Sequence, residues 1–264
     1  MVFKINRMKR VVIFGELPIA TKVLLFLNQI TDVEIVGAVT QKRNKGNVDP
    51  FDCPSLYDYC IKENIPIFSF QDLRDKFQPG DLDFGFSVRF SYILKEDIIS
   101  LFKYSIMNFH GGLLPEFAGL YSSCHTILQE SAIAGGTLHL ITDSGIDSGN
   151  ILKRCEFPTE PNDTSETIFQ KTQLVLFDGF CEIVNDFLEQ KVESISQQEL
   201  VLSGKSNCYY DKKSLVKELF LDNDIKRKIS VHARGFEFTG HERGYIVVDG
   251  MRIYFTTKNL EGFI

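Results

Sequence analysis

An amide, an imidazole and a carboxylate lie close together in the middle of the sequence. Asn108 and His110 are separated by one residue, and Asp147 follows in a short segment between Gly145 and Gly149. An amide N–H and an imidazole can donate hydrogen bonds to a developing oxyanion, and an imidazole can also carry a proton. The carboxylate can orient that imidazole. Spacing alone leaves an alternative open, in which the histidine is a buried core residue and the aspartate serves a turn.

These residues need a scaffold, and the sequence predicts one of alternating strands and helices. Runs that are apolar throughout, rather than alternating, are typical of parallel strands covered on both faces. We expect strands at residues 10–14, 33–40, 65–68, 82–88, 106–110, 136–142 and 151–157, and helices at residues 18–27, 55–63, 94–102, 122–132 and 164–191. The predicted fold class is α/β, an open, mostly parallel sheet with helices on both faces. Asn108 and His110 then face one side of a strand end, where open α/β sheets bind ligands.

The C-terminal residues have a different pattern. Residues 244–255 predict a β-hairpin that turns at Asp249-Gly250, a dipeptide suited to a two-residue hairpin loop. We therefore expect two parts, a catalytic domain over residues 1–205 and a small C-terminal region over residues 206–264 that contains this hairpin.

Composition argues against several classes of protein. The chain has 264 residues, with 29 Lys and Arg against 35 Asp and Glu, and a formal net charge of −6. This acidic balance argues against a nucleic-acid partner, because grip on a phosphate backbone comes from clustered Lys and Arg. The apolar runs are too short to span a bilayer and we identify no signal peptide, so we expect a cytoplasmic protein without a membrane partner. The six cysteines lack metal-binding spacing, so we expect reduced thiols and no metal site.

Two nucleotide-binding motifs are incomplete. The turn after the first predicted strand begins at Gly15 but lacks the second glycine of G-x-G-x-x-G and contains Pro18, which argues against a nicotinamide dinucleotide. Gly204-Lys205-Ser206 matches the end of a P-loop, but position 199 is Glu where a P-loop has Gly, so we interpret the match as chance.

Three segments together resemble the folate-dependent formyltransferases. They are residues 108–119 (NFHGGLLPEFAG), 136–139 (GTLH) and 145–149 (GIDSG). Their order and spacing follow the family pattern N-x-H-x-S-L-LP…G, then G-x-T-x-H, then D-x-G, and the resemblance covers roughly residues 8–190. It implies a Rossmann-like domain that transfers a formyl group from N10-formyltetrahydrofolate, a co-substrate, to an amine.

The resemblance also assigns roles, residue by residue. Asn108 and His110 would stabilise the oxyanion, and Asp147 would hold His110 and accept the proton of the amine. The folate pocket would be formed by two loops, at Ser87, Val88, Arg89, Phe90, Thr142, Asp143 and Ile146.

The sequence departs from the family pattern in two places. Gly111-Gly112 replaces the usual Pro-Ser, which predicts a looser loop after His110. Residues 121–123 (YSS) differ from the arginine-containing loop of methionyl-tRNA formyltransferases.

The C-terminal tail favours one branch of the family. Residues 234–238 and 250–254 resemble the tails of N-formyltransferases that act on nucleotide-linked amino sugars such as dTDP-4-amino-4,6-dideoxyglucose, for O-antigen and surface polysaccharide biosynthesis. This resemblance implies a homodimer. Residues 190–264 are few for the β-barrel of methionyl-tRNA formyltransferases, and the acidic charge also argues against tRNA. Two alternatives stay open: glycinamide ribonucleotide formyltransferase of purine synthesis, and a non-catalytic folate- or nucleotide-sugar-binding protein.

Overall fold

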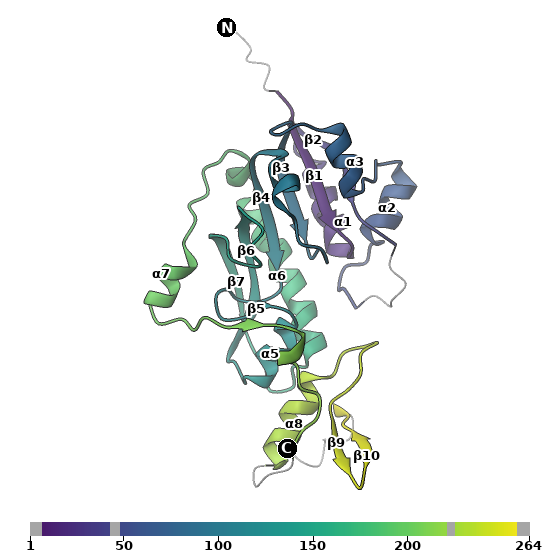
Figure 1. Cartoon of the computed structure of the whole chain (residues 1–264), viewed down its shortest axis with the longest axis vertical. Coiled ribbons are helices and arrows are strands. Elements are labelled where there is room, and N and C mark those ends of the chain that lie inside the picture. The colour runs from purple at the N-terminus through teal and green to yellow at the C-terminus, as the bar shows by residue number, and fades with distance from the viewer. Residues whose placement is uncertain (1–6, 43–47, 221–224, 258–264) are drawn as a thin grey trace.

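A six-stranded sheet forms the centre of the computed structural model, which describes residues 7–42, 48–220 and 225–257 (Figure 1). Its strands in spatial order are β2 (Val33–Val39), β1 (Lys9–Gly15), β3 (Leu82–Val88), β4 (Phe102–His110), β6 (Ile133–Ile141) and β7 (Ile151–Pro158). From β2 to β4 all neighbours are parallel, whereas β6 is antiparallel to both β4 and β7. The mostly parallel Rossmann-like sheet that the sequence predicts is therefore confirmed.

Helices cover both faces of this sheet, as β1 illustrates. Val11 and Ile13 pack in one core cluster with α1 (Pro18–Leu27) and α6 (Ser165–Leu188). Val12 and Phe14 point the other way, into a second cluster with α3 (Phe70–Lys76) and α4 (Glu96–Ile99). The remaining helix of this half, α2 (Leu56–Glu63), lies on the α1 side. Successive residues of β1 are buried on opposite faces, which is why the strand is apolar throughout.

The long helix α6 begins where its capping residues predict. The Thr164 side chain accepts a hydrogen bond from the Thr167 N–H, and the Thr167 side chain accepts one from the Thr164 N–H, a capping box. The same device starts α3, where Ser69 and Asp72 satisfy each other's backbone N–H groups. The helix α3 is not among the predicted elements, although Ser69 and Asp72 form the residue pattern of a capping box.

Three predicted elements differ in the structure. The expected strand at residues 65–68 is a single bridge between Ala38 and Ile67, because Ser69 already caps α3. The expected helix at 94–102 is only the short α4, because Phe102 pairs with Leu82 and so begins β4. The expected helix at 122–132 is α5 (Ser122–Leu128), which ends earlier.

The C-terminal part first pairs with the segment between β4 and α5, in a separate two-stranded sheet. After α7 (Gln197–Leu202), β8 (Tyr209–Tyr210) pairs with β5 (Ala118–Gly119), and a 3-10 helix, η1 (Lys212–Ser214), follows.

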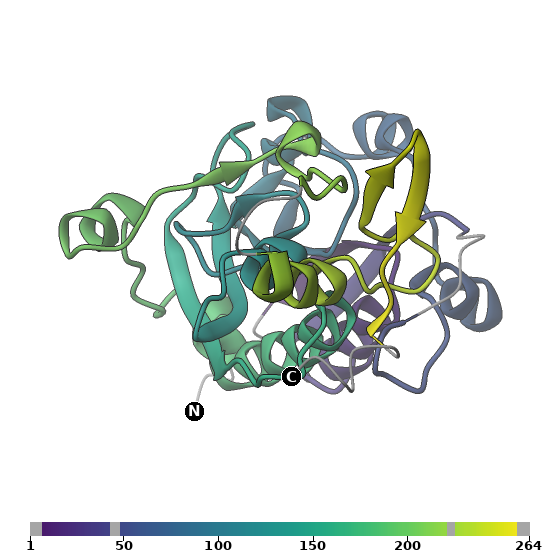
Figure 2. The same ribbon diagram turned by 90° about the horizontal axis from the view of Figure 1, so that it is seen from below.

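The last elements lie together beyond the carboxyl ends of the parallel strands (Figures 1 and 2). The helix α8 (Ile225–Gly235) packs against α5, and β9 (Tyr245–Val248) and β10 (Met251–Tyr254) form an antiparallel pair. The predicted hairpin turns at Asp249 and Gly250, which both have positive φ, as a two-residue loop requires. No helix within the described ranges is long and apolar enough to cross a membrane. A domain boundary at 205/206 stays a prediction.

Candidate active site

The carboxyl end of β4 places Asn108 beside His139. In the sheet register Asn108 pairs with His139 of β6, and its Nδ2 lies 2.8 Å from His139 Nε2. His139 Nδ1 lies 3.0 Å from the Leu140 carbonyl oxygen, which can only accept, so Nδ1 carries the ring proton. Nε2 then accepts from Asn108. The second N–H of the Asn108 amide stays available to a ligand.

Asp147 joins the two histidines from the loop that follows β6. Its Oδ1 lies 3.3 Å from His110 Nδ1 and 3.6 Å from His139 Nε2. The other oxygen, Oδ2, accepts a hydrogen bond of 2.9 Å from the Gly119 N–H. Burial alone would raise the pKa of this carboxyl, but the charge and hydrogen bond of His110 outweigh burial and hold the pKa of Asp147 well below its usual range. Asp147 therefore remains a carboxylate.

His110 is fixed from both sides of its ring. Its Nε2 donates to the Phe117 carbonyl oxygen at 2.8 Å, so the proton on Nε2 is held by the backbone. Nδ1 faces Asp147 Oδ1 at 3.3 Å. The Asp147 carboxylate and the Phe117 carbonyl therefore contact the two nitrogens of this ring.

The expectation of a loose loop at Gly111-Gly112 is wrong. A Cβ on Gly111 would lie 2.1 Å from Arg89 Nη1, and one on Gly112 would lie 2.6 Å from the Phe117 carbonyl oxygen. The Gly112 carbonyl also accepts a hydrogen bond of 2.8 Å from the Thr137 hydroxyl. The two glycines thus permit close packing around the residue that follows His110.

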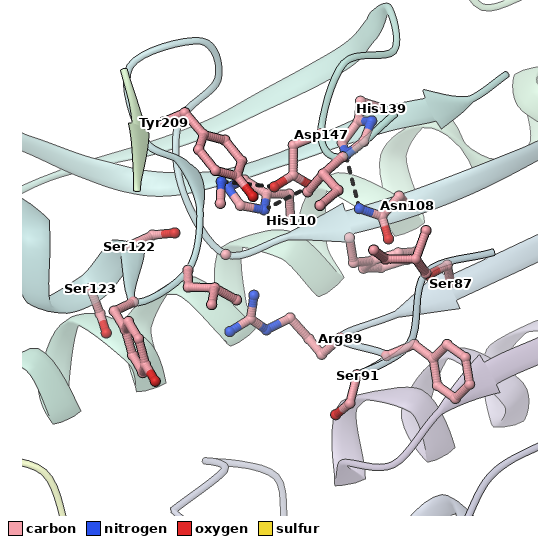
Figure 3. Close-up of a pocket in the computed structure, with 18 of the residues that line it drawn as sticks. Ser87, Arg89, Ser91, Asn108, His110, Ser122, Ser123, His139, Asp147 and Tyr209 are labelled. Carbon is pink, nitrogen blue, oxygen red and sulfur yellow. Dashed lines mark hydrogen bonds and ion pairs between the residues drawn. The ribbon is translucent and has the colours of Figure 1, made fainter. Parts of the chain in front are cut away.

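These groups open into one cavity of about 680 Å³ (Figure 3). Six of the seven residues predicted for the folate pocket line it: Ser87, Arg89, Phe90, Thr142, Asp143 and Ile146. The seventh, Val88, is fully buried in the core, so its side chain does not reach the cavity. Arg89 has a φ of 51°, in the left-handed region, and its guanidinium points into the cavity between Gly111 and Phe169.

The far wall of the cavity comes from the C-terminal part of the chain. Lys217, Phe236, Phe238 and Glu242 line it, and Tyr209, also from this part of the chain, lies beside His110 and Asp147 (Figure 3). None of these residues is among the predicted site residues.

Three further groups that the sequence did not predict lie near Asn108, His110 and Asp147. His139 contacts both Asn108 and Asp147, and its segment GTLH was visible in the sequence, but its contacts depend on the β4–β6 register. The Phe117 carbonyl and the Gly119 N–H are backbone groups, so the residue type at these positions does not predict their role. Within residues 7–42, 48–220 and 225–257, no group of three or more His, Cys, Asp or Glu side chains is placed to hold a metal ion.

Sequence comparison identifies relatives. The pattern of the formyl transferase family matches residues 9–183. A methionyl-tRNA formyltransferase from Prochlorococcus marinus is 27% identical over 197 residues, which are 71% of this chain and 58% of the relative. One from Wolbachia of Drosophila simulans is 26% identical over 262 residues, 92% of this chain and 87% of the relative. The chain thus spans little more than half the length of the Prochlorococcus enzyme.

Solved structures show the same fold. WlaRD, a sugar 3N-formyltransferase solved with dTDP and 5-N-formyl-THF, has a TM-score of 0.73 at 23% identity and covers 94% of this chain and 85% of its own. An N-formyltransferase from Helicobacter canadensis, in complex with folinic acid and dTDP-3-aminofucose, has a TM-score of 0.73 at 21% identity over 93% and 86%. Because the family pattern covers more than half of the sequence, this chain belongs to the formyl transferase family.

Proposed function

We propose that this protein transfers the formyl group of N10-formyltetrahydrofolate to the amino group of a nucleotide-linked amino sugar. The observation that carries the proposal is one continuous cavity, which reaches from Asn108, His110 and Asp147 to Phe238 and Glu242 of the C-terminal region. A cavity of about 680 Å³ falls in the range of small-molecule sites.

The catalytic residues have complementary tasks in this proposal. The bound folate supplies an activated formyl carbon. Asn108 donates its second amide N–H where negative charge develops on the formyl oxygen, and such a donor is worth about 10²–10³ in rate. The amine nitrogen bonds to the formyl carbon, the bond from that carbon to N10 breaks, and tetrahydrofolate leaves. The proton that the amine loses passes by way of the Asp147 carboxylate and His110 Nδ1 to the departing N10, because His110 Nε2 is already held by Phe117.

One end of the cavity suits the folate. Tyr92, Ile93 and Ile146 are exposed side chains in its wall and offer apolar surface on which a flat aromatic group could pack. Ser87 and Thr142 bring polar groups to the same walls. We assign Ser87, Arg89, Phe90, Thr142, Asp143 and Ile146 to folate binding, and Val88 only through its backbone.

The other end suits a nucleotide-linked acceptor. Phe236 and Phe238 offer aromatic surface for a base. Lys217, which pairs with Glu242 at 2.9 Å in the same wall, brings an ammonium group that a diphosphate could recruit. The dTDP ligands of the two solved relatives support this choice. The C-terminal wall favours an amino sugar over glycinamide ribonucleotide, whose transferases usually end soon after the long helix.

The curated sequence relatives raise methionyl-tRNA as another acceptor. A net charge of −6 favours a small acceptor over a polyanion. A non-catalytic binding protein would have no need of the buried contacts among Asn108, His110, His139 and Asp147.

Three further expectations accompany this proposal. We expect a homodimer, a cytoplasmic location and a role in surface polysaccharide synthesis. The exposed side chains of Val247, Met251 and Ile253 on the β9–β10 hairpin support the first. Size-exclusion chromatography with light scattering tests it.

A direct assay tests the proposed function. The protein is incubated with N10-formyltetrahydrofolate and, separately, with dTDP-, UDP- and GDP-linked amino sugars, glycinamide ribonucleotide and methionyl-tRNA. Mass spectrometry then detects the acceptor that gains a formyl group. Formylation of a nucleotide-linked amino sugar is expected, and turnover of only glycinamide ribonucleotide or methionyl-tRNA would overturn the proposal.

A further inference from the structure

A segment after α6 wraps around the loops that hold His110 and Asp147. It comprises residues 195–210, here called the strap, and it includes α7 and β8. In Figure 1 the strap leaves the edge of the sheet, passes through α7 at the side of the molecule and returns across β5. It starts with two backbone hydrogen bonds of 2.8 Å between Ile195 and Ile151, the first residue of β7.

Gln197, at the start of α7, ties the strap to the Asp147 loop. Its side-chain Nε2 donates to the Asp147 carbonyl oxygen at 2.7 Å and to the Gly149 carbonyl oxygen at 3.0 Å. Asp147 has a φ of 50°, a conformation that is costly for a residue with a Cβ and persists only where the surroundings impose it. A single amide group thus fixes the backbone that aims the Asp147 carboxylate.

The end of the strap ties down the loop on the other side of His110. The Cys208 N–H donates to the Pro115 carbonyl at 3.2 Å, and the Cys208 carbonyl accepts from the Ala118 N–H at 3.1 Å. The Tyr210 carbonyl accepts from the Leu120 N–H at 2.7 Å. This loop supplies the carbonyl that holds His110 and the N–H that holds Asp147.

The approach of strap and loop is close and specific. Gly119 has a φ of 91°, and a Cβ there would lie 2.1 Å from the Tyr210 carbonyl oxygen. The Tyr210 ring stacks on buried His125 with centroids 3.9 Å apart and planes 20° apart. Lys205 of the strap also meets Glu116 at 3.3 Å.

We propose that the strap sets the geometry of the His110–Asp147 pair, with Gln197 as its positioning residue. The inference rests on the proposed function for its rate readout. Gln197 acts on the pair through the Asp147 and Gly149 carbonyls, and the strap backbone acts through the loop that contains Phe117 and Gly119. The Tyr209 side chain of the strap lines the cavity itself. Small displacements of a catalytic group are enough to slow a reaction strongly.

The test compares Gln197→Glu with Gln198→Glu. Both substitutions add the same charge at neighbouring positions, but the Gln198 side chain is exposed and only Gln197 donates to the Asp147 loop. We expect kcat of Gln197→Glu to fall about 10- to 100-fold with little change in KM for either substrate, while Gln198→Glu stays near the wild-type value. Gln197→Met, a neutral side chain without donors, is expected to follow Gln197→Glu if the added charge disturbs folding.

Amide hydrogen exchange gives a readout that needs no substrate. In Gln197→Glu and Gln197→Met the Gly119 N–H is expected to exchange faster than in the wild type and in Gln198→Glu, because its acceptor Asp147 is no longer held. Failure of the wild type to formylate any acceptor would count against the proposed function. The exchange rate of the Gly119 N–H would still test whether Gln197 holds the Asp147 loop. Unchanged exchange at Gly119, or a change in KM alone, would overturn the strap proposal.

Discussion

The guanidinium of Arg89 occupies the space that a side chain at Gly111 would fill. An added Cβ on Gly111 would lie 2.1 Å from Arg89 Nη1 and 2.5 Å from Arg89 Cζ. Arg89 Cζ also lies 5.5 Å from the centroid of the Phe169 ring, in a cation–π arrangement. Because Gly111 has no side chain, the positively charged guanidinium of Arg89 can lie in the wall of the candidate active site, next to His110.

The two adjacent glycines are expected to respond differently to alanine. In Gly111→Ala the clashing atom is the far end of a flexible arginine, which can move, so the loss of unfolding free energy should stay below about 1 kcal/mol. In Gly112→Ala the clash is with the Phe117 carbonyl oxygen, and overpacking against backbone costs about 1–3 kcal/mol. Urea denaturation of both variants measures the difference, and a larger loss in Gly111→Ala would contradict this packing.

Asp147→Asn is expected to lower kcat by about 10²- to 10⁴-fold, the usual contribution of a positioned acid–base group. The substitution keeps the shape of the side chain but removes the charge that faces His110 Nδ1 and His139 Nε2. Nucleotide-sugar binding, measured by calorimetry, should change little because Asp147 lies at the reacting end of the cavity. Rates within a few-fold of the wild type would show that Asp147 has no catalytic part.

The sequence was sufficient for the sheet and for part of the site. β1 is apolar at every buried position, and α6 has its capping box at Thr164, so both could be predicted from local pattern. Asn108 and His110 could be placed together because alternation along a strand fixes their common side.

Other contacts depend on chain pairing that a local pattern does not contain. His139 reaches Asn108 through the antiparallel register between β4 and β6, over 31 residues of sequence. Gln197 reaches Asp147 over 50 residues, by way of a segment with no apolar periodicity. The predicted strand at 65–68 is wrong because only Ile67 forms a bridge to the sheet, and Ser69 already caps the next helix.

His125 is expected to make stability fall between pH 6.5 and pH 4. Burial lowers the pKa of His125 from 6.5 to about 4, so the unfolded chain binds a proton in this window and the folded protein does not. Stability therefore decreases as pH falls, by up to about 3 kcal/mol from this residue. His125→Phe keeps a ring against Tyr210 and removes the titration, so its free energy of unfolding should depend less on pH in this window.

Urea denaturation at a series of pH values measures this difference between His125→Phe and the wild type. Burial also lowers the pKa of His232. Since His232 is present in both proteins, it contributes equally to the pH dependence of their free energies of unfolding and drops out of the comparison. Parallel stability curves for the two proteins would show that His125 is not the group responsible.

Arg154 forms ion pairs with both Glu116 and Glu156. We expect the pair with Glu116 to contribute more to the free energy of unfolding than the pair with Glu156. Arg154 Nη1 and Nη2 lie 2.7 and 3.0 Å from the two carboxylate oxygens of Glu116, whose side chain is 14% exposed. Arg154 Nε meets Glu156 at 2.8 Å, but that side chain is 43% exposed. Glu116→Gln leaves a buried guanidinium short of its counter-charge and should cost about 2 kcal/mol, whereas Glu156→Gln should cost less than about 1 kcal/mol. Thermal and urea unfolding of the two variants measure the costs, and equal losses would mean that burial does not distinguish the two ion pairs.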